Sequence, residues 1–84
     1  MSIPQEIEDN FYAGKRSEQI RFTIDDVVKI TSGEAQGKEG TVIELESIEP
    51  EATYTIELSD GSADVEVTQS NMEMVTASDF HEKH

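Results

Sequence analysis

Apolar and polar side chains alternate in short runs between residues 22 and 76. The clearest run is 53–58, in which Tyr54, Ile56 and Leu58 share one face and polar residues separate them. Alternation with a period of two is typical of half-buried β-strands. The same reasoning places further strands at 27–30, 41–45, 63–67 and 72–75. Five short strands at roughly 10-residue spacing, joined by glycine-rich turns, predict an all-β, five-stranded barrel.

The connections between these runs carry signals of their own. The Asp60–Gly61 pair favours a type I′ hairpin turn, in which positive φ angles are needed. The polar stretch 68–71 suits a single 3₁₀ turn. Within the second and fourth predicted strands, the expected inward side chains are those of Val42, Leu45, Val65 and Val67.

The first 21 residues are polar with a weak amphipathic pattern. Ile3, Ile7 and Phe11 recur every four residues, which would place them on one face of a short helix. So short a helix is marginal in isolation and needs to dock on the barrel or on a partner. The sequence therefore predicts an N-terminal arm at 1–21, flexible or weakly helical, a barrel at 22–76 and a disordered tail at 77–84.

Residues 25–42 carry the most distinctive pattern in the chain. A β-branched run leads into a loop with Gly33, Gly37 and Gly40, and a second β-branched run leads out. Glycines in such a loop mark positions where the chain turns tightly, or where two backbones approach too closely for a Cβ atom. A strand that ends in this loop and then restarts folds back on itself.

The run Val28–Gly33 followed by Gly37–Val42 closely resembles the KOW motif of a large-subunit ribosomal protein and of Nus-type and Spt-type transcription elongation factors. Gly37 stands at the hallmark glycine of that family. The resemblance implies an SH3-like barrel over residues 24–75, and a module that contacts RNA, ribosomal proteins or polymerase through its loops. The chain departs from the family at Asp25–Asp26, where Gly-Asp is frequent, and in its scarcity of lysine and arginine.

Acidic residues dominate the predicted barrel. The whole chain carries 6 Lys+Arg and 19 Asp+Glu, a formal net charge of −13. Within 22–76 the only basic residues are Lys29 and Lys38, against 13 carboxylates, a net charge of −11. Such a surface repels phosphate backbones and either favours basic partners or serves only solubility. RNA binding is therefore disfavoured, although high salt would screen the repulsion.

No residue pattern supports enzyme chemistry. The chain has no cysteine, and both histidines, His81 and His84, fall in the predicted tail. The closing His-Glu-Lys-His run is one residue short of the zinc-binding His-Glu-x-x-His motif, and the acids of 44–51 lack the spacing of a calcium loop. Phe22 and Tyr54 are too few aromatics to line a groove for proline-rich peptides. We therefore expect no catalytic residue, no metal site and no cofactor.

Three hypotheses follow. The primary one is a non-enzymatic protein-interaction module, an adaptor or accessory subunit that binds a basic partner through loops 33–40 and 59–62. The alternative is an RNA- or ribosome-associated module that uses Lys29 and Lys38. In the third, the terminal arms of an accessory subunit fold on contact with a larger complex. The candidate partner contacts are Lys29, Glu34, Gln36, Lys38, Glu39 and Asp60.

Location follows from the same composition. No apolar run approaches the roughly 18 residues of a membrane span, and residues 1–6 lack the basic and apolar regions of a secretory signal. The lack of cysteine fits a reducing compartment. We expect a cytoplasmic protein without membrane association, monomeric when alone.

Overall fold

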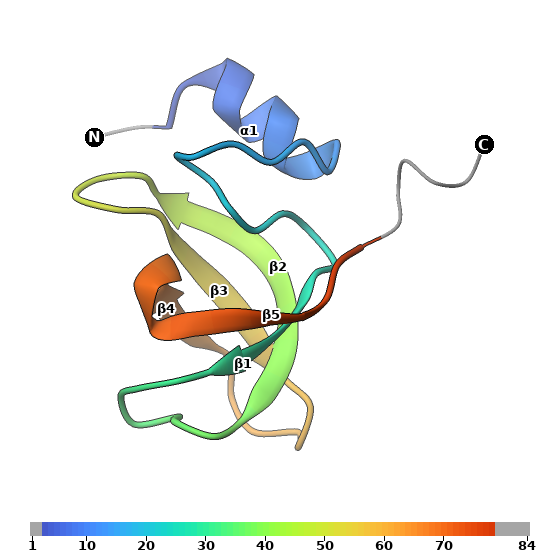
Figure 1. Ribbon diagram of the computed structural model, residues 1–84, viewed down its shortest axis with the longest axis vertical. Coiled ribbons are helices and arrows are strands. Elements are labelled where there is room, and N and C mark those ends of the chain that lie inside the picture. Colours follow the sequence, from blue (N-terminus) through green and yellow to red (C-terminus); the bar gives the residue numbers. More distant parts are fainter. Residues whose placement is uncertain (1–2, 79–84) are drawn as a thin grey trace.

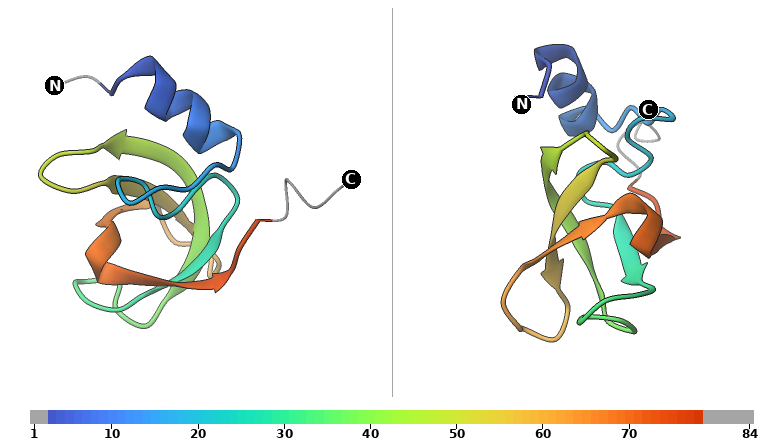
Figure 2. Two further views of the ribbon diagram at one scale, coloured as in Figure 1. Left: turned by 45° about the horizontal axis from the view of Figure 1, so that its top comes forward. Right: turned by 90° about the vertical axis from the view of Figure 1, so that its left-hand side faces the viewer.

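Five antiparallel strands follow one short helix in the structure, a computed structural model that describes residues 3–78 (Figure 1). The sheet has the order β4-β3-β2-β1-β5 and curls into a small SH3-like barrel (Figure 2). The predicted all-β class is thereby confirmed, while most of the predicted tail, residues 79–84, lies outside the described residues. The elements are α1 (Gln5–Tyr12), β1 (Val27–Ile30), β2 (Glu39–Ser47), β3 (Thr53–Leu58), β4 (Val65–Thr68), the 3₁₀ turn η1 (Gln69–Asn71) and β5 (Met72–Thr76).

The core is filled by the inward side chains that the alternation predicts. In β3 the buried residues are Tyr54, Ile56 and Leu58. Val42 and Leu45 of β2 are also buried, although they are three positions apart. They share a face because the register between β2 and β3 shifts between Val42 and Glu44, where a β-bulge adds one residue to β2. In β4, Val67 is buried and Val65 is half-buried against the core.

A buried hydroxyl joins three parts of the chain inside this core. The Tyr54 hydroxyl donates a hydrogen bond to Gln69 Oε1 at 2.8 Å and accepts one from the Phe22 backbone N–H at 3.4 Å. The Arg21 backbone N–H donates to the same Gln69 oxygen. Burial raises the pKa of Tyr54 to about 12. The network thus fixes the segment before β1 against β3 and η1.

The N-terminal segment packs on the barrel as a helix. α1 lies across one end of the barrel, beside the end of β2 (Figures 1 and 2). Phe11 is completely buried, and its ring lies 6.2 Å from that of Tyr54, centroid to centroid. Ile3 and Ile7 pack against the same core. Of the two states that the sequence leaves open for this segment, the structure shows the helical one, docked on its own barrel.

Asp26 holds this N-terminal segment in place. Its carboxylate is fully buried and accepts hydrogen bonds from Arg16 Nη2 at 2.5 Å, the Thr23 backbone N–H at 2.8 Å and the Ser78 backbone N–H at 2.7 Å. A buried carboxylate needs such partners, because its loss of hydration is otherwise uncompensated. The stretch 13–19, part of the arm predicted to be flexible or weakly helical, is tied to the barrel through Arg16.

Two glycines of the β1–β2 connection serve the two purposes expected of them. Gly37 has φ 91°, a left-handed conformation that favours glycine, and a Cβ there would meet nothing within 4 Å. Gly40 lies within β2, where a Cβ would stand 2.6 Å from both the Glu57 carbonyl oxygen and Ile56 Cγ2. Asp25, two residues before β1, is left-handed as well, with φ 72°.

The Asp60–Gly61 turn differs from the prediction. Only Gly61 has positive φ, whereas a type I′ turn needs it at both central residues. The connection is wider, spanning 59–64, and β4 begins at Val65 rather than Ala63. The physical reason lies in the Asp60 side chain, which accepts a hydrogen bond from the Ser62 backbone N–H at 2.9 Å and so stabilises an Asx-type loop.

The docking of α1 predicts a large effect of one substitution. Phe11→Ala should lower the free energy of unfolding by about 3–5 kcal/mol, because it removes a fully buried aromatic ring from the shared core. The neighbouring Tyr12→Ala, on the exposed side of α1, should change it by less than about 1 kcal/mol. Urea denaturation followed by circular dichroism measures both. If Phe11→Ala lowered the free energy of unfolding as little as Tyr12→Ala, α1 would not contribute to the core.

The glycine geometry predicts contrasting responses to asparagine. Asparagine tolerates the left-handed region, so Gly37→Asn should cost less than Gly37→Ala, which should cost about 1–2 kcal/mol. At Gly40 both substitutions should cost about 1–3 kcal/mol or more, because any Cβ collides with β3. Denaturant midpoints of the four variants test this. If asparagine rescued stability at Gly40, steric exclusion would be the wrong explanation there.

Candidate functional site

The outer face of β2, β3 and β4 carries glutamates and no basic residue. These three strands contain no lysine or arginine. The register pairs Glu44 with Thr55 and Thr55 with Glu66, so that the two glutamates lie in one row across the sheet. Glu46 and Glu57 lie two positions along their strands from this row, on the same face. We refer to Glu44, Glu46, Glu57 and Glu66 as the acidic face.

The glutamates of the acidic face repel one another. The pKa of Glu44 is raised above its ordinary value of 4.5, first by the negative charge of Glu46 and further by Glu8 and Glu66. The Thr55 hydroxyl donates a hydrogen bond to the Glu46 carboxylate. Like charges on neighbouring strands destabilise a sheet. The fold therefore tolerates an unfavourable arrangement on a face that no other described element covers.

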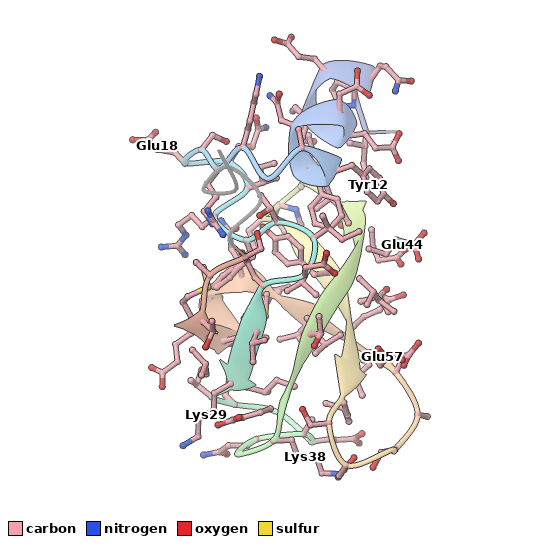
Figure 3. The ribbon with its side chains drawn as sticks, turned by 90° about the vertical axis from the view of Figure 1, so that its right-hand side faces the viewer. Tyr12, Glu18, Lys29, Lys38, Glu44 and Glu57 are labelled. Atoms are coloured by element: carbon pink, nitrogen blue, oxygen red, sulfur yellow. The ribbon has the colours of Figure 1, made fainter. Side chains whose placement is uncertain are left out.

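Helix α1 extends the acidic face. Tyr12 is 45% exposed and lies beside Glu44 (Figure 3). Its pKa is raised, first by partial burial and then by the carboxylates of Glu44, Glu8 and Glu46. An exposed aromatic ring bordered by carboxylates suits a cationic side chain, since the ring face and the negative charges both attract it.

Two loops predicted to contact a partner are joined at the opposite end of the barrel. Lys38 Nζ lies 3.2 Å from Asp60 Oδ2 and donates a hydrogen bond to the Ser62 hydroxyl at 3.4 Å. Hydrogen bonds from Ser62, then the charge of Lys38, lower the pKa of Asp60 to about 2. Lys38 is thus already engaged by a carboxylate. Gln36 is exposed in the same β1–β2 loop.

Lys29 is also bordered by acids. In the sheet it pairs with Glu39 of β2 on one side and with Glu73 of β5 on the other, and all three side chains are exposed. Opposite charges in such cross-strand positions attract. Lys29 and Lys38 lie near the end of the molecule that is remote from Tyr12, whereas Tyr12, Glu44 and Glu57 follow one another along its side (Figure 3).

A groove lies where the β1–β2 loop faces β4. It has a volume of about 500 Å³, and Gly33 and Glu34 line it on the loop side. Gly33 is a second left-handed glycine, with φ 96°. The predicted contact residues thus separate into three places: the groove for Glu34, the joined loops for Lys38 and Asp60, and the β1–β2 surface for Lys29 and Glu39.

The acidic face itself was not among the predicted contact residues. Alternation along β3 and β4 identifies Glu57 and Glu66 as outward-facing, and this is the signal that could have selected them, whereas the outward position of Glu44 in β2 depends on the bulge after Val42. The contribution of Glu8 and Tyr12 depends on where α1 docks, which the local sequence does not specify.

Other kinds of site receive no support from the described part of the chain. Within residues 3–78, no three histidine, cysteine, aspartate or glutamate side chains are placed to hold a metal ion. No helix in this part of the chain has the length and apolar character to cross a membrane. His81 and His84 lie outside the described residues.

Comparison with known proteins identifies no relative of this chain. No protein-family model, no curated protein and no solved structure matches the chain.

The repulsion within the acidic face predicts a titration effect. Glu46→Gln should lower the pKa of Glu44 towards 4.5, because the charge of Glu46 is the largest cause of its elevation. A raised pKa means that folding favours the protonated form of the Glu44 carboxyl group. The contribution of Glu44 to the stability of the fold is therefore present below pH 4.5 and is lost as the pH rises through its folded-state pKa.

Carboxyl-carbon NMR titration of Glu44 measures this change directly. Glu18→Gln is the matched control, because Glu18 lies on the other side of the molecule (Figure 3). An unchanged Glu44 midpoint in Glu46→Gln would contradict the assignment.

Proposed function

We propose that this protein is a non-enzymatic interaction module that binds a protein with a basic surface through its acidic face. The observation that carries the proposal is the row of glutamates on the uncovered faces of β2, β3 and β4, with no basic residue in those strands. Complementary charge accelerates encounter and selects against wrong partners. Such a surface suits either an adaptor or an accessory subunit.

Tyr12 adds an aromatic contact to the charges of the acidic face. Tyrosine is enriched among the residues that dominate binding energies at interfaces. Its position beside Glu44 and Glu8 offers an aromatic contact where a lysine or arginine of the partner would be held by carboxylates. The resemblance of residues 28–42 to the KOW motif supports the same class, since modules of that family contact proteins as well as RNA.

The arrangement of cations weighs against the RNA alternative. Within residues 3–78, Lys38 pairs with Asp60, Arg16 pairs with Asp26, and Lys29 lies between two glutamates, so that only Lys15 and Arg21 stand outside these arrangements. Phosphate binding rests on free cations that displace counterions. A phosphate approaching Lys29 or Lys38 would have to displace or oppose a nearby carboxylate.

Charge reversal tests the proposal with a defined probe. The probe is a terminally blocked peptide whose lysines form one block, with a single-stranded RNA oligonucleotide as comparison. Glu44→Lys with Glu46→Lys should weaken peptide binding by about tenfold or more, measured by fluorescence anisotropy at low ionic strength. The control pair, Glu18→Lys with Glu73→Lys, makes the same change in net charge away from the acidic face.

Two results would reject the proposal. One is an equal loss in both double variants, which would show that net charge alone attracts the peptide. The other is that the protein binds the RNA oligonucleotide more tightly than the peptide, and that the double substitution Lys29→Glu with Lys38→Glu abolishes this RNA binding. That result would favour the RNA alternative.

A further inference from the structure

β4 is an edge strand whose outer side is unpaired. Its residues Val65–Thr68 pair with β3, and within residues 3–78 no backbone hydrogen bond joins them to another segment. An edge strand presents a row of free N–H and C=O groups, to which a further strand can be added. At β4 this edge is short and carries Glu66, features that oppose uncontrolled pairing between copies.

The groove described above runs along this edge, and we call it the β4 groove. Its volume of about 500 Å³ lies within the range of ligand-binding pockets. Apolar side chains contribute to its lining from both sides: Ile30 and Ala35 from β1 and the β1–β2 loop, Val65 and Val67 from β4. Glu34 and Glu66 add a carboxylate on each side, and both are exposed.

We propose that the β4 groove binds an extended peptide segment of alternating apolar and basic residues, which adds to the sheet as a strand beside β4. This inference rests on the proposed function, because it specifies the form in which a basic protein partner is recognised. The free edge supplies backbone pairing, the half-buried Ala35 and Val65 receive apolar side chains, and Glu34 and Glu66 attract lysine or arginine.

The lining residues exclude other occupants. None of them is aromatic, so a proline-rich helix lacks the ring surfaces that it requires, and none is lysine or arginine, so a phosphate backbone lacks cations. The opposite edge, β5, fits a basic strand less well, because the groove beside it is lined by both Arg21 and Glu73, whose charges cancel, whereas the β4 groove has two carboxylates and no cation. Charge thus distinguishes the two free edges of the sheet.

Backbone methylation provides the decisive experiment. The probe is a short, terminally blocked peptide of alternating lysine and valine. In an added strand only every second N–H points at β4. Methylating one alternate set of amides should therefore weaken binding by about tenfold or more, whereas methylating the other set should change it by less than about threefold. Amide NMR shifts should move at 65–68 and not at 72–76.

Side-chain variants separate this inference from the acidic face. Glu34→Lys should weaken the alternating peptide several-fold and leave the lysine-block peptide nearly unchanged, since Glu34 lines only the groove. Glu44→Lys should do the reverse. If Glu44→Lys left binding of the lysine-block peptide unchanged while the two methylated peptides still differed, the acidic face would be rejected as a binding site but the β4 groove would not.

Three outcomes would overturn the β4 groove proposal. The two methylated peptides could behave alike, the alternating peptide could bind no better than the lysine-block peptide, or the shifts could fall on β5. Since Glu34→Lys changes an exposed loop residue, unchanged thermal unfolding confirms that its effect on binding is direct.

Discussion

The buried carboxylate of Asp26 is the constraint on which the arrangement of this molecule depends. A charge removed from water must be neutralised and hydrogen-bonded, and here the three donors come from three separate parts of the chain. Its own backbone groups bond to Thr23 and to Val42 of β2. The N-terminal segment, the start of β1, the middle of β2 and the chain after β5 are therefore held around one residue.

This constraint determines where α1 lies, and so shapes the functional surface. Arg16 is held by Asp26 and Phe11 packs near Tyr54, and these two contacts fix the position of α1 on the barrel. In this position Glu8 and Tyr12 lie within electrostatic range of Glu44. A structural interaction in the interior thus extends the acidic face from the sheet onto the helix.

The sequence could predict the features that depend on local pattern. Alternation located the β3 strand and its inward side chains, and the glycine spacing marked Gly37 and Gly40 as positions of either a tight turn or a close backbone approach, without deciding between the two. It could not predict features that depend on side-chain competition or on distant segments. At Asp60 the carboxylate binds Ser62 and Lys38, which favours a wider loop than the dipeptide suggests.

The docking of α1 is one of the features that depend on distant segments of the chain. The spacing of Ile3, Ile7 and Phe11 defines an apolar stripe but not the surface that receives it, because any apolar patch would bury it equally well. The β4 groove was unpredictable for a related reason: its two sides are about thirty residues apart along the chain and meet only when the sheet curls. Edge position is a property of topology rather than of strand sequence.

The acidic face and the β4 groove are chemically distinct but physically continuous at Glu66. This residue shares the outer row with Glu44 and also lines the groove. The acidic face can attract any basic surface, because long-range charge is insensitive to backbone conformation. The groove demands an extended segment with a free backbone, which is a far narrower requirement. A partner that satisfies both gains a fast encounter from the first and selectivity from the second, so that high acidity need not imply indiscriminate binding.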